Sequence, residues 1–136
     1  MSVTTALYQV DQHRRSDPRA AAGGGRMWSR RSTERPDYLI ARVEGELDAV
    51  GLDDFRALLG RCCREECRVV VLDLRATTFL CLRAAAALAA AKSDAWRCGV
   101  ELRLVSGRHD IERALGVTGV RHQFRYFPTL RTALIG

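Results

Sequence analysis

The feature that most constrains the fold is an almost unbroken apolar run over residues 68–74. After Arg68 the run contains three valines and two leucines, and Asp73 is its only further charged residue. A strand with one face in water alternates apolar and polar residues, whereas a continuous apolar run is typical of a strand covered on both faces. The run therefore predicts the central strand of a sheet that has helices packed against it.

The segments on either side of this strand alternate between strand-like and helix-like patterns. Further strands are predicted at residues 27–31, 38–43, 100–105 and 124–127. Helices are predicted at residues 52 to about 66, 82 to about 96, 109–115 and 129–134. Strands that alternate with helices form βαβ crossovers, so we expect one α/β domain with a mostly parallel sheet of about four to five strands and about four helices against it.

Four residues mark predicted boundaries and turns. Gly45 is expected to end the second strand in a sharp turn, and Gly116 to close the helix that begins at His109. Asp48 is expected to cap the following helix through its carboxylate. Asp73 lies near the end of the central strand, where open α/β sheets place their sites, but it is as well suited to hold the next loop by hydrogen bonds.

The positive charge is concentrated at the N-terminus. The net charge is +6, and residues 1–36 carry seven arginines against three acidic residues, whereas the other 100 residues carry 15 basic and 13 acidic side chains. Residues 11–26 have no sustained apolar period and include Pro18 and three consecutive glycines. We therefore expect a flexible basic arm over residues 1–26, a folded domain over residues 27–136, and no specific nucleic-acid binding.

The sequence lacks the signals of several other protein classes. No run approaches the roughly 18 apolar residues that span a bilayer, and early charges interrupt any signal-peptide core, so we expect a cytoplasmic protein without membrane contact. Cys63 and Cys67 have no second pair at zinc-ligand spacing. No histidine has partners at the spacing of a catalytic triad, and no glycine-rich phosphate loop is present. We expect no metal, no cofactor and no enzymatic activity.

Five ordered segments carry a resemblance to a known family. They are Gly45–Asp48, Val69–Leu74, Thr78–Leu80, Gly99–Val105 and Leu115–Gly119. In order and spacing these segments resemble the STAS family, in particular its anti-sigma factor antagonists, over about residues 27–136. The fold that this resemblance implies agrees with the α/β prediction.

The resemblance implies a phosphorylation switch that this chain lacks. In antagonists that look like this one, the loop after the Thr-Phe-Ile strand end reads Asp-Ser-Ser-Gly, and a partner kinase phosphorylates the second serine. Here those positions hold Cys81, Leu82, Arg83 and Ala84, so Arg83 replaces the phosphoacceptor. Thr77 and Thr78 are the only hydroxyls nearby, and both are expected to be strand-end residues.

Two functions remain open from the sequence. The leading one is a protein-binding regulator whose surface around Asp48, Thr78 and Cys81–Ala84 docks an anti-sigma factor or a related regulatory kinase and is not switched at Arg83. The alternative is a ligand-sensing or redox-sensing STAS-like module with a different partner, because Cys81 and four other cysteines are many thiols for 136 residues. The oligomeric state stays open, although small α/β domains commonly form homodimers.

Overall fold

The computed structural model describes residues 26–107, 109–117 and 124–136. The strands are β1 (Arg26–Arg31), β2 (Tyr38–Leu47), β3 (Val69–Asp73), β4 (Thr77–Leu80), β5 (Glu101–Val105) and β6 (Arg125–Phe127). The helices are α3 (Leu52–Arg64), α4 (Leu82–Arg97), α5 (His109–Val117) and α6 (Leu130–Ile135). The predicted basic arm lies outside the described residues, except for Arg26, which is the first residue of β1.

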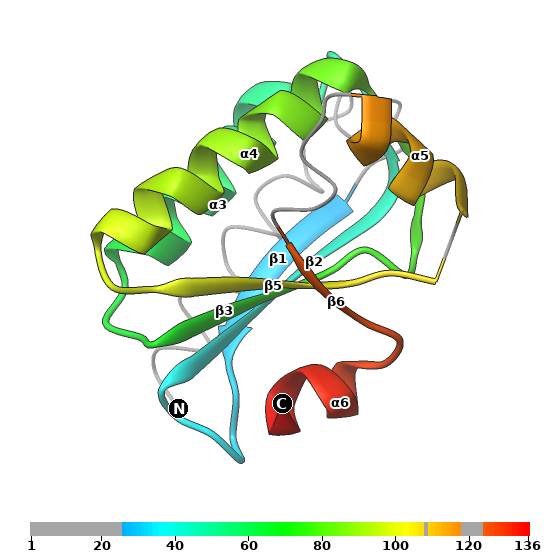
Figure 1. Cartoon of the computed structure of the whole chain (residues 1–136). Coiled ribbons are helices and arrows are strands. Elements are labelled where there is room, and N and C mark those ends of the chain that lie inside the picture. The colour runs from blue at the N-terminus through cyan, green and yellow to red at the C-terminus, as the bar shows by residue number, and fades with distance from the viewer. Residues whose placement is uncertain (1–25, 108, 118–123) are drawn as a thin grey trace.

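The strands form one sheet in the order β1-β2-β3-β5-β6 (Figure 1). Only β1 runs antiparallel to its neighbour, and the other strand pairs of the described residues are parallel. The predicted α/β class and mostly parallel sheet are confirmed. The sheet has six strands because β4 pairs with the C-terminal end of β2, outside the main strand order.

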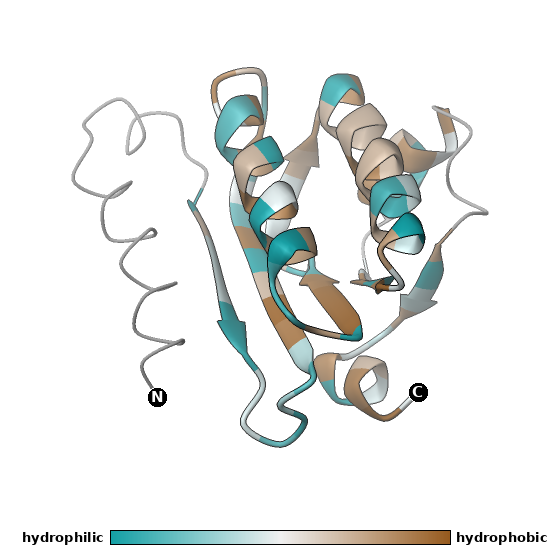
Figure 2. Cartoon of the chain, turned by 90° about the vertical axis from the view of Figure 1, so that its left-hand side faces the viewer, coloured by the Kyte–Doolittle hydropathy of each residue, from teal (hydrophilic) through white to brown (hydrophobic). Residues whose placement is uncertain are grey.

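Helices cover both faces of the sheet (Figure 2). On one face α3 and α4 close the main core, which contains Val70 and Leu72 of β3. On the other face α6 contacts β3, β5 and β6 and packs over Val69 and Val71. Every residue of β3 is buried, so the double-faced burial predicted from the apolar run is confirmed.

Two predicted boundaries were wrong. Gly45 has a positive φ of 82°, as a turn glycine would, yet β2 continues through it to Leu47. The register between β2 and β4 shifts at Gly45 and Glu46, so the glycine accommodates a bulge rather than ending the strand. Helix α5 does not close at Gly116 and runs on to Val117.

A buried arginine joins α6 to the sheet. The side chain of Arg103 on β5 is 4% exposed, and its Nη1 donates a 2.7 Å hydrogen bond to the carbonyl oxygen of Ala133 in α6. Its Nε donates to Glu101 Oε2 at 2.9 Å. Arg35 adds a second bond, from Nη1 to the carbonyl oxygen of Leu134 at 3.1 Å. These donors satisfy carbonyls in the last turn of α6, which lack partners within the helix.

Candidate functional site

The predicted site residues lie where β2 and β4 end side by side. Leu47 is paired with Leu80, and the backbone N–H of Cys81 donates to the carbonyl oxygen of Leu47 at 3.0 Å. This bond places the loop that begins at Asp48 next to the start of α4. The parallel register therefore brings together two segments that are more than thirty residues apart in the sequence. We call this end of the sheet the site edge.

Asp48 does not cap a helix, contrary to the sequence prediction. Its Oδ1 accepts a 3.1 Å hydrogen bond from the backbone N–H of Val50. Helix α3 begins later, at Leu52, and its N-cap residue Gly51 makes no side-chain cap bond. The carboxylate of Asp48 therefore shapes the loop, as aspartates do in Asx turns, and the dipole of α3 is met instead by Asp53 and Asp54 in its first turn.

The start of α4 divides into an outward and an inward part. Leu82 and Arg83 are exposed, whereas Ala84 is fully buried in the core. Cys81 is the N-cap residue, with an extended backbone and no side-chain cap bond. Of the residues predicted here, Leu82 and Arg83 are therefore free to touch a partner, and Ala84 acts by packing α4 against the sheet.

The two threonines of β4 have different surroundings. Thr77 is fully buried, and its hydroxyl donates to the carbonyl oxygen of Val43 at 2.8 Å. Thr78 is exposed on the strand. Thr77 is the first residue of β4 and packs inside the protein, whereas Thr78 is the second residue of the strand and is the exposed one of the two.

An exposed apolar surface at the site edge was not predicted from the sequence. Val50, Phe79 and Leu82 are 65%, 50% and 53% exposed. Val50 follows Leu47 by three residues, Phe79 is paired with Glu46, and Leu82 opens α4, so all three surround the end of β2. We call them the apolar patch. Large apolar side chains that are exposed near one end of a sheet are candidates for an interaction surface.

Behind the site edge, a buried carboxylate holds two arginines. Asp73 closes β3 with a side chain that is 2% exposed, and it accepts bonds from Arg42 Nη1 at 3.0 Å and Arg75 Nη2 at 2.8 Å. The backbone N–H of Arg75 also donates to Asp73 Oδ1 at 3.0 Å. Burial alone raises the pKa of Asp73, but the hydrogen bonds from Arg75 and the charges of Arg75 and Arg42 lower it below its ordinary value. Asp73 thus holds the loop into β4 by hydrogen bonds, one of the two roles expected from the sequence.

The largest group of cysteines lies away from the site edge. Burial, reinforced by its neighbouring thiols, raises the pKa of Cys62 to about 12. Burial also raises the pKa of Cys63 and Cys67. Because the thiolate is the reactive form, these three thiols are poorly suited to redox sensing. Among the described residues, no three histidine, cysteine, aspartate or glutamate side chains are grouped to hold a metal ion.

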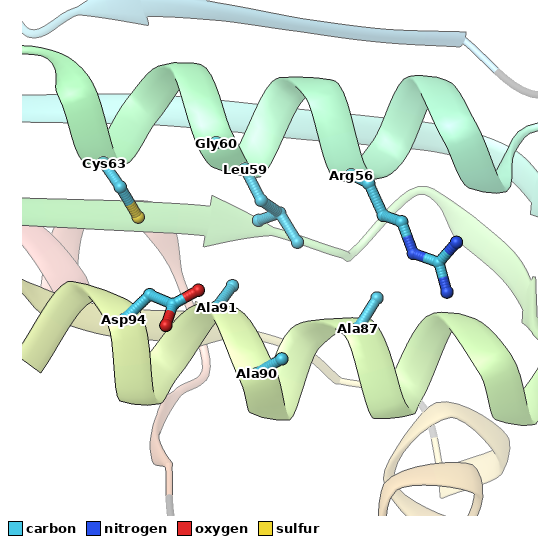
Figure 3. Close-up of a pocket in the computed structure, with 8 residues that line it drawn as sticks. All are labelled: Arg56, Leu59, Gly60, Cys63, Ala87, Ala90, Ala91 and Asp94. Atoms are coloured by element: carbon cyan, nitrogen blue, oxygen red, sulfur yellow. The ribbon is translucent and has the colours of Figure 1, made fainter.

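A shallow groove of about 220 Å³ lies between α3 and α4 (Figure 3). Its floor is made of Gly60, Ala87 and other small residues, with Cys63 and Asp94 near one end and Arg56 near the other. Small side chains let two helices approach closely, so the groove is a feature of their packing. Within the described part of the chain, no helix has the length and apolar character needed to cross a membrane.

A comparison with models of protein families identifies the family of this chain. The model for the STAS domain matches residues 29–133. The chain belongs to the STAS domain family. A search of curated proteins found no match. The STAS match covers every element of the site edge, from β2 to α4.

Several solved structures share the fold. An anti-sigma factor antagonist from Mycobacterium paratuberculosis is 22% identical, with a TM-score of 0.73 over 82% of this chain and 92% of that one. The phosphorylated Bacillus cell fate determinant SpoIIAA is 12% identical, with a TM-score of 0.58 over 73% of this chain and 89% of that one. The murine anion transporter Slc26a9 is 20% identical, with a TM-score of 0.64 over 73% of this chain and 17% of that one. At these identities the likeness concerns the fold.

The N-terminus of α4 is electrostatically unfavourable in this STAS domain, which leads to a first prediction. Arg83 lies in the first turn, where a cation opposes the helix dipole, and that turn has no acidic residue. Arg83→Glu is expected to raise the free energy of unfolding by about 0.5–1 kcal/mol, less at high salt. Arg97→Glu, in the last turn of the same helix, is expected to lower it. Urea denaturation at two salt concentrations measures both, and a stabilisation by both variants would contradict this explanation.

Proposed function

We propose that this STAS domain is a non-catalytic regulator that binds an anti-sigma factor or a related regulatory kinase at its site edge. The observation that carries the proposal is the exposed apolar patch of Val50, Phe79 and Leu82 beside the start of α4. These side chains surround the position at which the antagonists that the sequence resembles are phosphorylated. Burying such apolar residues is the principal source of binding free energy in protein interfaces.

The proposed binding is constitutive, because Arg83 replaces the phosphoacceptor. Arg83 is exposed and has no hydroxyl. The solved relative SpoIIAA has a phosphorylated form, in which added negative charge changes the surface of the protein. An arginine supplies positive charge, so it cannot imitate that form. A kinase partner would therefore bind this chain without being able to end the interaction at residue 83.

The chemistry at the site edge supports binding rather than catalysis. The carboxylates of Asp48 and Asp73 are engaged in local hydrogen bonds, to Val50 N–H and to Arg75 and Arg42. The hydroxyl of Thr77 is bonded to a backbone carbonyl. These groups stabilise loops, so the side chains left to a partner at this edge include Val50, Phe79, Leu82, Thr78 and Arg83.

The contribution of the patch is tested by two matched substitutions on α4. Leu82→Glu adds a charge in the patch, and Trp96→Glu adds the same charge near the other end of the helix, where Trp96 is 75% exposed. Leu82→Glu is expected to weaken binding of the partner at least about tenfold, because a charge would be desolvated at the interface. Trp96→Glu is expected to leave binding unchanged.

The experiment is a pull-down from native cell extract with wild type and both variants, followed by identification of the retained proteins and titration of the purified partner. Retention of an anti-sigma factor or related kinase by wild type and Trp96→Glu, but not by Leu82→Glu, would support the proposal. Equal retention by all three proteins would show that the site edge is not the docking surface. If wild type retains no such protein, the regulatory role is wrong.

A further inference from the structure

The groove between α3 and α4 brings a thiol of one helix close to the other helix. Both helices begin at the site edge, so Cys63 near the end of α3 and Asp94 near the end of α4 lie at the same far end of the groove. Their side chains point into the space between the helices (Figure 3). Gly60 and Ala91 next to them are small, which lets the two helix backbones approach closely. Cys63 is therefore within reach of the last turn of α4.

Cys98 lies one turn beyond Asp94 on the same face of α4. Its backbone N–H donates to the carbonyl oxygen of Asp94 at 3.2 Å, which is the hydrogen bond between residues four apart in a helix. Residues at this spacing share one helix face, and the Cα–Cβ bond of each tilts toward the N-terminus. This geometry directs the side chain of Cys98 back toward Asp94 and the end of the groove. The thiol of Cys98 is also exposed.

The electrostatics of Cys63 indicate the same two neighbours. Burial raises the pKa of the Cys63 thiol, and the charges of Cys98 and Asp94 raise it further. Because the interaction of two charges weakens with their separation, this effect requires both groups to lie near Cys63. The raised pKa keeps Cys63 protonated and makes it a poor first target for an oxidant. The exposed thiol of Cys98 is the one that an oxidant meets first.

We propose that Cys63 and Cys98 form a reversible disulfide between α3 and α4 when the protein meets a hydroperoxide. The hydroperoxide transfers one oxygen atom to the sulfur of Cys98, which becomes a sulfenic acid, and departs as the alcohol, or as water when it is hydrogen peroxide. The sulfur of Cys63 then attacks the sulfenic sulfur. The S–O bond breaks as the S–S bond forms, and the hydroxyl group leaves with the proton of Cys63 as water. A dithiol reductant restores both thiols by exchange.

The other cysteines of the described residues are less well placed to react with Cys98. Cys62 is 1% exposed and packs in the core. The thiol of Cys67 donates to the carbonyl oxygen of Cys62 at 3.8 Å, so it is directed toward the end of its own helix. Cys81 precedes α4 at the site edge, at the opposite end of that helix. Cys63 is therefore the thiol that we expect to pair with Cys98.

The disulfide would fasten the two helices that cover one face of the sheet. Its cysteines are more than thirty residues apart in the sequence, and a crosslink that closes a long loop stabilises a protein mainly by restricting its unfolded chain. The crosslink also lies far from the site edge, where both helices begin. Oxidation is therefore expected to raise the stability of the domain without altering the surface assigned to the partner.

Peptide mapping after oxidation tests the proposal. The purified full chain is reduced, diluted, treated with hydrogen peroxide, alkylated and digested with trypsin without reductant. The expected main product is a disulfide within one chain that joins the peptide of residues 62–64 to the peptide of residues 98–103, and dithiothreitol is expected to reverse it. A mixture of isotope-labelled and unlabelled chains separates this product from disulfides between copies.

Matched variants identify the two sulfurs. Cys63→Ser and Cys98→Ser are each expected to abolish the disulfide, and Cys67→Ser, at the end of the same helix as Cys63, to preserve it. In Cys63→Ser, dimedone is expected to trap a sulfenic acid at Cys98. Absence of the disulfide in wild type, its persistence in Cys63→Ser, its loss in Cys67→Ser or its formation only between copies would overturn the proposal.

The effect on stability has a separate readout. The Tm of oxidised wild type is expected to exceed that of reduced wild type by several degrees, whereas peroxide is expected to leave the Tm of Cys98→Ser unchanged. Cys98 is exposed, so its replacement is compatible with the fold. Equal Tm values for oxidised and reduced wild type, beside a confirmed disulfide, would overturn the stabilising role of the crosslink.

Discussion

Replacing Arg103 by alanine is expected to lower the free energy of unfolding by about 2–4 kcal/mol, because a buried side chain is lost and a buried carbonyl is left without its donor. The guanidinium is almost fully buried and bonds to Glu101, to the carbonyl oxygen of Ala133 and, at 3.4 Å, to the hydroxyl of Tyr38. It also lies 5.4 Å and 5.6 Å from the ring centroids of Tyr38 and Phe127. Its removal leaves a cavity under α6 and a carbonyl without its donor.

Arg125→Ala is the matched control, because Arg125 binds the same carboxylate from the surface. Its Nη1 donates to Glu101 Oε2 at 2.9 Å, but its side chain is 58% exposed. Exposed ion pairs contribute about 0–1 kcal/mol, so Arg125→Ala is expected to have an effect in that range. Urea denaturation followed by circular dichroism measures both variants. Comparable losses would show that the position of Arg103 under α6 is not what matters.

The second large effect is expected at the buried carboxylate behind the site edge. Asp73→Asn is expected to cost about 2–4 kcal/mol at neutral pH, because it removes the charge that Arg42 and Arg75 share and replaces one of the two acceptor oxygens by an NH2 group that cannot accept from them. Glu44 also pairs with Arg42, and the side chain of Glu44 is 30% exposed. Glu44→Gln is therefore expected to lower the free energy of unfolding by less than about 1 kcal/mol.

The pH dependence follows from the lowered pKa of Asp73. Because the folded protein holds this carboxyl ionised more firmly than the unfolded chain does, its contribution is complete above the ordinary carboxyl pKa of about 4. The contribution is lost as the pH falls through the lower pKa of the folded state. The stability of wild type should therefore decline more steeply in acid than that of Asp73→Asn. Parallel decline of the two proteins below pH 4 would show that Asp73 is not responsible.

The sequence predicted the central strand and the α/β class better than it predicted where the strands end. Residues 69–72 are apolar at every position, and burial on both faces is the physical consequence, so the central strand and the α/β class were clear from the sequence. Gly45 was ambiguous, because a positive φ suits both a turn and a bulge. Only the pairing of β2 with the four-residue β4 distinguishes the two, and that pairing is a long-range contact.

The sequence predicted where the site lies, but not which of its side chains are buried, exposed or hydrogen-bonded. The family motif located Asp48 and the start of α4, and the structure places them together. It could not show that Ala84 is buried or that Asp48 bonds to Val50, because both depend on how the loop packs. Val50 and Phe79 were missed because an apolar residue within or near a strand is usually part of the core, and only the folded arrangement shows these two exposed.

The most direct test of the central claim uses the purified kinase partner, ATP, wild type and Arg83→Ser. Phosphate on each protein is located by mass spectrometry, and affinity is measured before and after incubation. The account predicts no phosphate and no loss of binding for wild type, with phosphate at residue 83 and weaker binding only for Arg83→Ser. Phosphorylation of wild type that ends binding, most directly at the exposed hydroxyl of Thr78, would contradict it.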